Sequence, residues 1–324
     1  MPATLSEFDI IRCYFERPAR GALLGVGDDA ALVRPVSGMD LAVSTDMLLE
    51  GRHFLAGAEP RALGHKALAV NLSDMAAMGA TPRWATLAIA LPECDEAWLA
   101  AFAEGLFALA ARHEVDLVGG DTTRGALTIA ITIFGEVPPG LALLRGGARP
   151  GDDVWVSGEL GGAALGLAHA QGRVALVAEA AAAVRTRLDQ PEPRVELGER
   201  LRGLASAAID ISDGLAGDLG HLLERSGVGA LVHYERLPKA RAFERVADPE
   251  LERECVLSGG DDYELCFTAP QAQRAHIEAL VTQTGVALTR IGAIQPGEAR
   301  LMLLDRAGKP LPHGGGFDHF RRRP

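Results

Sequence analysis

One stretch, Arg61 to Met78, constrains the fold most because it reads as a helix that is apolar around most of its surface. Pro60 precedes it and Gly79 follows it, and these residue types are typical of a helix start and a helix end. Such a helix is predicted to be buried. Asp74 falls on one of its apolar faces, where a carboxylate is costly unless it is neutralised, paired or bound to a metal ion. Asp74 is therefore a candidate functional residue.

The composition excludes several classes of protein. The chain has 324 residues, enough for two domains that each bury a core. Its formal net charge of −11 argues against a nucleic-acid or anionic-membrane partner. No apolar run approaches the roughly 20 residues that span a bilayer. The 4 cysteines are scattered without a Cys-x-x-Cys pair, which is typical of a reduced protein. We therefore expect a cytoplasmic protein that binds neither nucleic acid nor membrane.

Strand-like and helix-like segments alternate along both halves, which predicts an α/β protein. The Pro138-Pro139-Gly140 break is the best domain boundary and gives domains 1–138 and 139–324. In the first domain we expect helices over 5–18 and 96–113, strands over 41–46, 84–91, 116–118 and 127–134, and a glycine turn over 119–123. In the second we expect strands over 154–157 and 207–210, and a polar glycine turn over 257–265 that leads into another strand.

Many aspartates stand at strand ends or beside glycine, serine and threonine, where a ligand can approach closely: Asp28, Asp29, Asp46, Asp74, Asp121, Asp210, Asp213, Asp261 and Asp262. A single aspartate of this kind is usually a turn residue or a helix cap. So many of them without matching lysines favour a divalent cation, and oxygen ligands favour Mg²⁺ over zinc. Mg²⁺ sites of this type commonly hold substrate phosphates. The sequence has neither a Gly-x4-Gly-Lys-Ser/Thr phosphate loop nor the protein-kinase motifs.

The segments that carry these acids resemble, in one order along the chain, the thiamine-monophosphate kinase family. That family belongs to the superfamily of aminoimidazole ribonucleotide synthetase and selenophosphate synthetase. The resemblance runs from about Glu7 to Phe320. The matching segments are Gly27-Asp28-Asp29, Ser44-Thr45-Asp46, Asn71-Leu72-Ser73-Asp74, Gly119-Gly120-Asp121-Thr122-Thr123, Asp210-Ile211-Ser212-Asp213-Gly214 and Ser258-Gly259-Gly260-Asp261-Asp262-Tyr263-Glu264-Leu265.

The resemblance implies an N-terminal mixed-sheet domain that binds ATP and Mg²⁺ and forms a homodimer through its sheet. It also implies a C-terminal α/β domain, with the active site in the cleft between the two. The implied reaction transfers the γ-phosphate of ATP directly, in line, to thiamine monophosphate and yields thiamine diphosphate.

The resemblance also implies roles for individual residues. Several Mg²⁺ ions would be held by Asp29, Ser44, Thr45, Asp46, Asp74, Asp121, Asp210 and Asp213, with Asp28 as an alternative to Asp29. The residues in contact with ATP would be Gly120, Asp121, Arg145 and Ser212. The thiamine moiety would meet His53, Asp261 and Phe317. The residues expected to act on the transferred group are Asp46, Asp74, Asp121 and Arg145.

Two other functions stay open from the sequence. One is a binding protein that holds a thiamine phosphate or a nucleotide without turnover. The other is a different ATP-dependent enzyme of the same superfamily. Selenophosphate synthesis would need a reactive cysteine near the N-terminal glycine loop, and Cys13 stands too early for it. A hydrogenase-maturation relative would end in a cysteine-bearing tail, whereas this chain ends in Arg321-Arg322-Arg323-Pro324.

Overall fold

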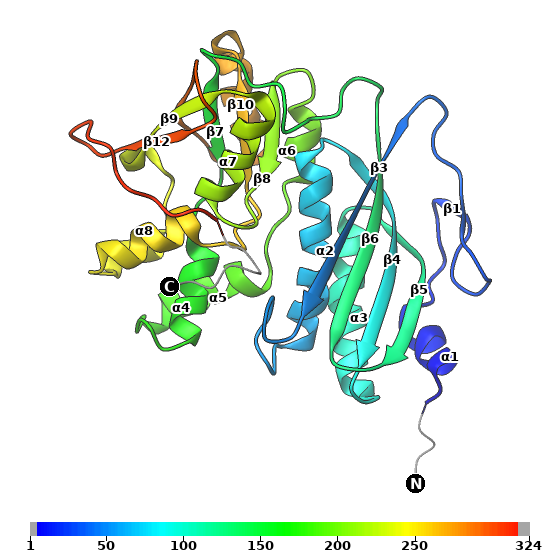
Figure 1. Ribbon diagram of the computed structural model, residues 1–324. Helices are drawn as coiled ribbons and strands as arrows, with labels where there is room; N and C mark the ends of the chain where they lie inside the picture. The colour runs from blue at the N-terminus through cyan, green and yellow to red at the C-terminus, as the bar shows by residue number, and fades with distance from the viewer. Residues whose placement is uncertain (1–4, 317–324) are drawn as a thin grey trace. The chain divides into compact units, whose positions relative to one another are not determined.

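The structure is a computed structural model that describes residues 5–316 (Figure 1). Phe317, which the resemblance assigns to the thiamine site, lies outside the described residues. Contacts divide the chain into two compact units, Met1–Met75 with Ala80–Gly140 and Ala76–Gly79 with Leu141–Pro324. The predicted two-domain α/β fold, with a mixed sheet in its N-terminal half, is confirmed. ATP binding and dimerisation by the first unit stay predictions.

The first unit is built on a four-stranded sheet in the order β3-β6-β4-β5, in which β4 and β5 are parallel and the other pairs antiparallel. A separate antiparallel pair is formed by β1 and β2. The elements of the first unit are α1 (Glu7–Ile10), the π-helix η1 (Ile11–Phe15), β1 (Ala22–Leu24), β2 (Leu32–Val33), β3 (Asp40–Leu49), α2 (Pro60–Ala77), β4 (Thr81–Leu91), α3 (Glu96–Arg112), β5 (Asp116–Arg124) and β6 (Thr128–Val137).

Two helices, α2 and α3, lie on one face of this sheet (Figure 1). Leu68 and Leu72 of α2, Phe102 of α3 and Ile131 of β6 are fully buried there. Asp95 begins α3 by accepting hydrogen bonds from the backbone N–H groups of the next turn. Gly79 follows α2 in the left-handed region, with φ of +61°, which ends the helix where the sequence predicted. The helix-covered face of the sheet is thus the core of the unit.

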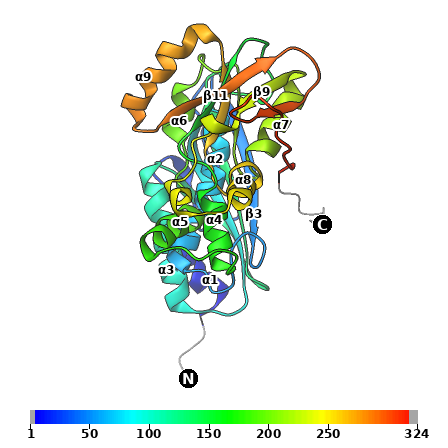
Figure 2. The same cartoon turned by 90° about the vertical axis from the view of Figure 1, so that its left-hand side faces the viewer.

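The second unit is built on a six-stranded mixed sheet in the order β12-β9-β11-β7-β10-β8. Only β12 and β9 pair in parallel among these strands. Helix α7 contacts β8, β10 and β12, and α9 contacts β11. Figure 2 shows α9 beside β11 in this unit.

The elements of the second unit are β7 (Asp153–Ser157), α4 (Gly162–Ala170), α5 (Ala178–Asp189), α6 (Val195–Arg200), β8 (Ala207–Asp210), α7 (Leu215–Ser226), β9 (Gly229–His233), η2 (Tyr234–Arg236), η3 (Arg241–Arg245), α8 (Pro249–Ser258), β10 (Leu265–Ala269), η4 (Gln271–Gln273), α9 (Arg274–Thr284), β11 (Leu288–Gln295) and β12 (Leu301–Leu304). In residues 5–316, no helix combines the length and the apolar character needed to cross a membrane.

Two local predictions are wrong. The expected helix over residues 5–18 is a single α-helical turn followed by a π-helix that ends at Phe15. The segment 119–123 is not a turn after a short strand, because β5 continues through it to Arg124 and pairs with β4. The two glycines hide this strand from a pattern search because they carry no side chain.

Candidate functional site

The first cluster of predicted site residues lies where β3 meets α2. The hydroxyl of Ser44 donates a hydrogen bond to the carboxylate of Asp74. The backbone N–H of Asp46 donates to Oδ1 of Asn71, 3.2 Å away, and Asn71 is anchored in turn to the carbonyl of Ala67. Asp74 is half-buried, so its predicted place on a fully covered helix face is wrong. Its side chain lies at the margin of the buried helix face, beside the edge strand β3, where Ser44 is its polar partner.

Thr45 faces away from this cluster because side chains alternate along a strand. Its hydroxyl lies 2.9 Å from that of Thr132 on β6, on the face of the sheet that α2 and α3 do not cover. Ser44 and Asp46 therefore share one face, and the side chain of Thr45 does not join them. A role for Thr45 as a metal ligand stays a prediction.

A second group of predicted residues lines a cavity of ≈ 610 Å³ within the first unit. Asp28, Asp29, Gly120 and Asp121 all border it, so the structure does not choose between the two candidate aspartates. A volume of this size is typical of a small-molecule site. The cavity also has an apolar wall that the sequence analysis missed, made by Phe8, Ile11, Phe15 and Val26.

Gly120, which also borders the cavity, is a position where only glycine fits. Its φ is +152°, and a Cβ there would lie 1.8 Å from the carbonyl oxygen of Leu87. The neighbouring Asp121 is exposed. The close packing of β5 against β4 therefore requires glycine here, and a carboxylate follows one residue later.

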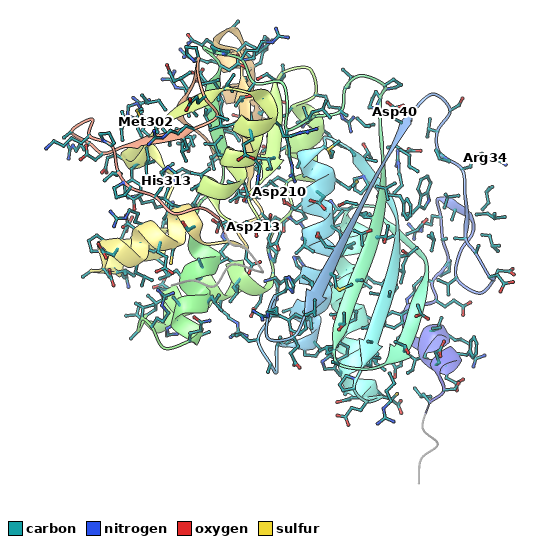
Figure 3. The ribbon with its side chains drawn as sticks, in the orientation of Figure 1. Arg34, Asp40, Asp210, Asp213, Met302 and His313 are labelled. Carbon is teal, nitrogen blue, oxygen red and sulfur yellow. The ribbon has the colours of Figure 1, made fainter. Side chains whose placement is uncertain are left out.

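In the second unit, two segments bring further predicted residues together after β8 and α8. The carbonyl of Ser212 accepts a hydrogen bond from the backbone N–H of Asp261 at 2.9 Å, and the carbonyl of Ile211 accepts one from Tyr263 at 2.8 Å. Asp213 follows directly, and Asp210 ends β8 in a buried position (Figure 3). Asp210, Ser212, Asp213 and Asp261 thus belong to one local structure.

A buried carboxylate that the sequence analysis did not consider holds this segment in place. Asp218, in the first turn of α7, accepts a hydrogen bond from the backbone N–H of Asp213 at 3.0 Å. Burial raises the pKa of the Asp218 carboxyl to about 7. This role could have been predicted from the sequence, because Asp218 follows Gly214 near a helix start, and Asp in a first turn commonly binds backbone N–H groups.

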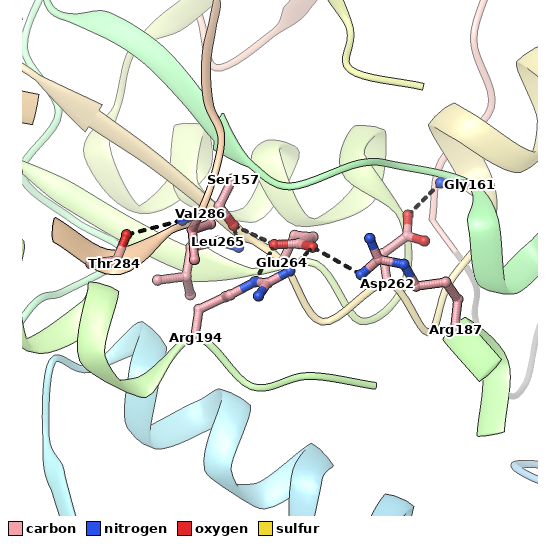
Figure 4. A network of polar contacts seen from close by, with 9 residues as sticks. All are labelled: Ser157, Gly161, Arg187, Arg194, Asp262, Glu264, Leu265, Thr284 and Val286. Carbon is pink, nitrogen blue, oxygen red and sulfur yellow. Dashed lines mark hydrogen bonds and ion pairs between the residues drawn. The ribbon is translucent and has the colours of Figure 1, made fainter. Parts of the chain in front are cut away.

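The segment that carries Asp261 is held in a strained form. Asp261 and Tyr263 have φ of +69° and +49°, which non-glycine residues adopt at a cost. The hydroxyl of Tyr263 donates to the Asp261 carboxylate at 3.1 Å. The side chains of Asp262 and Glu264 contact other parts of the unit. Asp262 accepts a hydrogen bond from the N–H of Gly161, and Glu264 is buried (Figure 4).

Glu264 is the anchor of this segment. Arg194 donates two hydrogen bonds to its carboxylate, at 2.7 and 2.6 Å, and Ser157 donates a third at 2.6 Å (Figure 4). Paired, hydrogen-bonded geometry of this kind is what makes a buried carboxylate tolerable. Desolvation raises the pKa of the adjacent Asp262 carboxyl well above its usual range.

The remaining predicted residues are placed individually. His53 stands in the turn after β3, where its Nδ1 accepts a hydrogen bond from the backbone N–H of Leu49 at 3.0 Å. Arg145 is exposed in the segment before β7, and the hydroxyl of Ser226 donates to its backbone carbonyl at 3.1 Å.

The donor set can be compared with what Mg²⁺ requires. Among residues 5–316, no three His, Cys, Asp or Glu side chains stand close enough together to form a metal site by themselves. Asp46, Asp74 and Ser44 offer two carboxylates and a hydroxyl, all hard oxygen donors. This set fits Mg²⁺, which is commonly bound by one or two carboxylates together with water and substrate phosphates.

Comparison with known proteins identifies the family. The model of the AIR synthase related protein N-terminal domain matches residues 27–137, and the model of its C-terminal domain matches residues 149–302. A Salmonella typhimurium protein named thiamine-monophosphate kinase is 46% identical over 320 residues, which cover 97% of this chain and 98% of that protein. The chain belongs to the thiamine-monophosphate kinase family.

Two solved structures of thiamine-monophosphate kinases resemble this one closely. The enzyme from Stenotrophomonas maltophilia has 46% identity and a TM-score of 0.84, over 90% of this chain and 93% of that one. A structure described as AaThiL complexed with AMPPCP and TMP has 31% identity and a TM-score of 0.77, over 89% of both chains.

Proposed function

We propose that this chain transfers the γ-phosphoryl group of ATP to the phosphate of thiamine monophosphate and so forms thiamine diphosphate. The observation that carries the proposal is the likeness to AaThiL, which binds AMPPCP and TMP. AMPPCP is a non-hydrolysable form of ATP, and we take TMP in this family to be thiamine monophosphate.

The chemistry requires that two polyanions be held close together, since the donor and the acceptor both carry phosphates. Bound Mg²⁺ would neutralise part of that charge, and Ser44, Asp46 and Asp74 would contribute ligands to it from the first unit. We propose that Asp29, Thr45, Asp121, Asp210 and Asp213 complete the set of metal ligands. The acceptor phosphate is already a competent nucleophile near pH 7, because its second pKa is near 6, so no general base is needed.

The remaining residues bind and orient the reactants in this proposal. Gly120, Asp121 and Ser212 contact ATP in this proposal. Arg145 donates charged hydrogen bonds to the phosphoryl group while it is transferred. Asp261, with His53 and Phe317, contacts the thiamine moiety. The strain at Asp261 supports this role, because strained residues persist where a rigid scaffold holds a functional group in position.

The prediction that both domains serve one active site is part of this proposal, as are direct in-line transfer and the use of several Mg²⁺ ions. So are the homodimer and the cytoplasmic location. The rival function, a binding protein without turnover, makes a different prediction in the same assay.

The test is an assay for ADP and thiamine diphosphate in mixtures of ATP, Mg²⁺ and thiamine monophosphate. The proposal predicts equal amounts of both products and no reaction when Mg²⁺ is chelated. Tight binding of both ligands with no ADP formed would overturn it in favour of the binding protein.

A further inference from the structure

The segment that follows β12 turns back along the edge of the second unit's sheet. We call residues 305–316 the tail. The N–H of Leu311 donates a hydrogen bond to the carbonyl of Leu303 at 2.8 Å, and Nε2 of His313 lies 3.2 Å from the carbonyl oxygen of Leu301. Both contacts attach the tail to β12, which is an edge strand. The last three described residues of the tail are all glycine, Gly314 to Gly316.

The tail crosses the first turn of α7 so closely that the two backbones are in contact. A Cβ atom on Gly217 of α7 would lie 2.6 Å from Cα of Gly316 and 2.8 Å from its nitrogen. A Cβ atom on Gly316 would in turn lie 3.0 Å from Cα of Gly217. Cβ atoms essentially never come within 3.0 Å of a non-bonded heavy atom. The crossing therefore requires glycine at position 217.

The tail also contacts the two segments that carry the predicted site residues of the second unit. The same Cβ atom on Gly316 would lie 3.0 Å from the carbonyl oxygen of Asp213 and 3.3 Å from its Cβ. A Cβ atom on Gly314 would lie 3.3 Å from Oγ of Ser258. Figure 3 labels His313 on the tail and Asp213 after β8. The tail thus reaches Asp213 at Gly316, and the next residue in the sequence is Phe317.

The crossing explains a glycine that is unfavourable for the helix itself. Glycine inside a helix is destabilising relative to alanine, so Gly217 needs a reason. Gly220 lies three residues further along the same helix, and a Cβ atom there would meet nothing within 4 Å. Leu215 and Leu219 hold α7 in the core, with 1% and 0% of their surfaces exposed. A side chain at 217 would therefore displace the tail and not the helix.

We propose that Gly217 and Gly316 are positioning residues for the acceptor substrate: their contact holds the tail against Asp213, and Phe317 binds the thiamine moiety from that fixed point. This inference rests on the proposed function, since it takes Asp213 and Phe317 to serve the same reaction. It adds two residues that set the affinity for thiamine monophosphate without contacting it. None of residues 305–316 borders the cavity of Gly120 and Asp121, so the affinity for ATP should not depend on the crossing.

An alanine variant at the crossing, with a matched control on the same helix, tests this. Gly217→Ala puts a methyl group between the two backbones, and Gly220→Ala adds the same group in open space. We expect Gly217→Ala to raise KM for thiamine monophosphate about tenfold, because the contact of an aromatic ring with the cationic thiazolium is weakened. Its kcat and its KM for ATP should stay at the wild-type values. Gly220→Ala should match the wild type in all three constants.

A second pair of variants lies in the tail and leaves the sequence of α7 unchanged. A Cβ atom on Gly316 meets backbone atoms at 3.0 Å, whereas one on Gly315 meets nothing within 4 Å. Gly316→Ala should raise KM for thiamine monophosphate less than Gly217→Ala does, because its contact is less tight. Gly315→Ala should not raise it. Thermal melting of all four variants checks that the fold is kept.

A double-mutant cycle distinguishes positioning from a general effect on the fold. Phe317→Ala removes the proposed contact with the thiamine moiety and should raise KM for thiamine monophosphate by itself. If Gly217 acts through Phe317, Gly217→Ala should raise this KM no further in the Phe317→Ala background.

Three results would overturn the inference while leaving the kinase function in place: equal kinetics for Gly217→Ala and Gly220→Ala, an unchanged KM in Phe317→Ala, or independent effects of Gly217→Ala and Phe317→Ala that multiply. If Gly217→Ala does not fold, the tail pair decides, and equal KM values for Gly316→Ala and Gly315→Ala would overturn the inference. A wild-type protein that forms no thiamine diphosphate would overturn the proposed function instead.

Discussion

The two units hold their predicted site residues by different physical means. In the first unit, Ser44 and Asp46 lie on the regular strand β3, and the alternation of side chains along it sets where they point. In the second unit, Asp261 lies in a turn with left-handed backbone, which the Glu264–Arg194 pair and the contacts of Asp262 hold in place. Regular strands position a side chain at no cost in strain, but they cannot place residues of opposite edges together. A strained turn can be aimed freely, provided that a buried network fixes it.

The largest effect is expected for the first unit's acids, which the fold does not need. Asp46→Ala or Asp74→Ala should lower kcat on the order of 10³-fold or more, because a charge that faces the transferred phosphates is lost. The melting temperature should stay near the wild-type value. Steady-state kinetics with a melting curve for each variant checks this. Near-normal turnover in both variants would contradict the metal-binding assignment.

The second unit should respond in stability to loss of its anchor. Arg194→Ala leaves the carboxylate of Glu264, which is 1% exposed, without its main partner, and should lower the free energy of unfolding by about 3–5 kcal/mol. Arg83→Ala in the first unit is a matched control, because Glu136 is similarly buried but Arg83 is 38% exposed. Arg83→Ala should lower the free energy of unfolding by less than Arg194→Ala does. Denaturant titration of both variants measures the difference, and equal losses would show that the anchor in the second unit is not special.

The apolar wall of the cavity that Gly120 and Asp121 border should set the affinity for ATP. Phe8 borders the cavity and is 74% exposed, so it is free to stack on the nucleotide base. Phe8→Ala should raise KM for ATP about tenfold, since stacking of a base on an aromatic ring contributes about 1–3 kcal/mol. KM for thiamine monophosphate should not change. Phe8→Tyr keeps the ring and should restore the wild-type value, whereas an unchanged KM for ATP in Phe8→Ala would remove Phe8 from the site.

The smallest effect concerns the pH dependence of stability. Desolvation raises the folded-state pKa of Asp262 above its unfolded value near 3.8, so the folded protein binds the extra proton between the two values. This contribution favours folding at low pH and is lost as pH rises through the folded pKa. The side chain of Asn in Asp262→Asn does not titrate, so the free energy of unfolding of this variant should change less with pH in this range. Free energies of unfolding measured from pH 4 upward provide the check, and parallel curves for both proteins would contradict it.

Local patterns in the sequence predicted the elements but not how they are assembled. Pro60 and Gly79 predicted both ends of α2 to within one residue, because helix start and stop signals are local in the sequence. The continuation of β5 through Gly119 and Gly120 was missed because glycine has no side chain to show a period. The half-buried place of Asp74 depends on which strand lies beside α2, and helical periodicity does not contain that information.

The site follows the same rule. The acids that mark the family could be found by their neighbours in the sequence, as with Asp210 and Asp213. The groups that support them could not: Arg194 and Glu264 are 70 residues apart, and nothing local to either one points to the other. Asp218 was visible as a helix-start acid, yet only the structure shows that it binds the N–H of Asp213.

The most direct test of the account is a crystal structure with AMPPCP, Mg²⁺ and thiamine monophosphate bound. The account predicts a triphosphate bound through Mg²⁺ to Asp46 and Asp74, with the base in the cavity that Gly120 and Asp121 border and the acceptor phosphate in line with the γ-phosphorus. A triphosphate that lies too far from Asp46 and Asp74 of every copy to share an ion with them would contradict it.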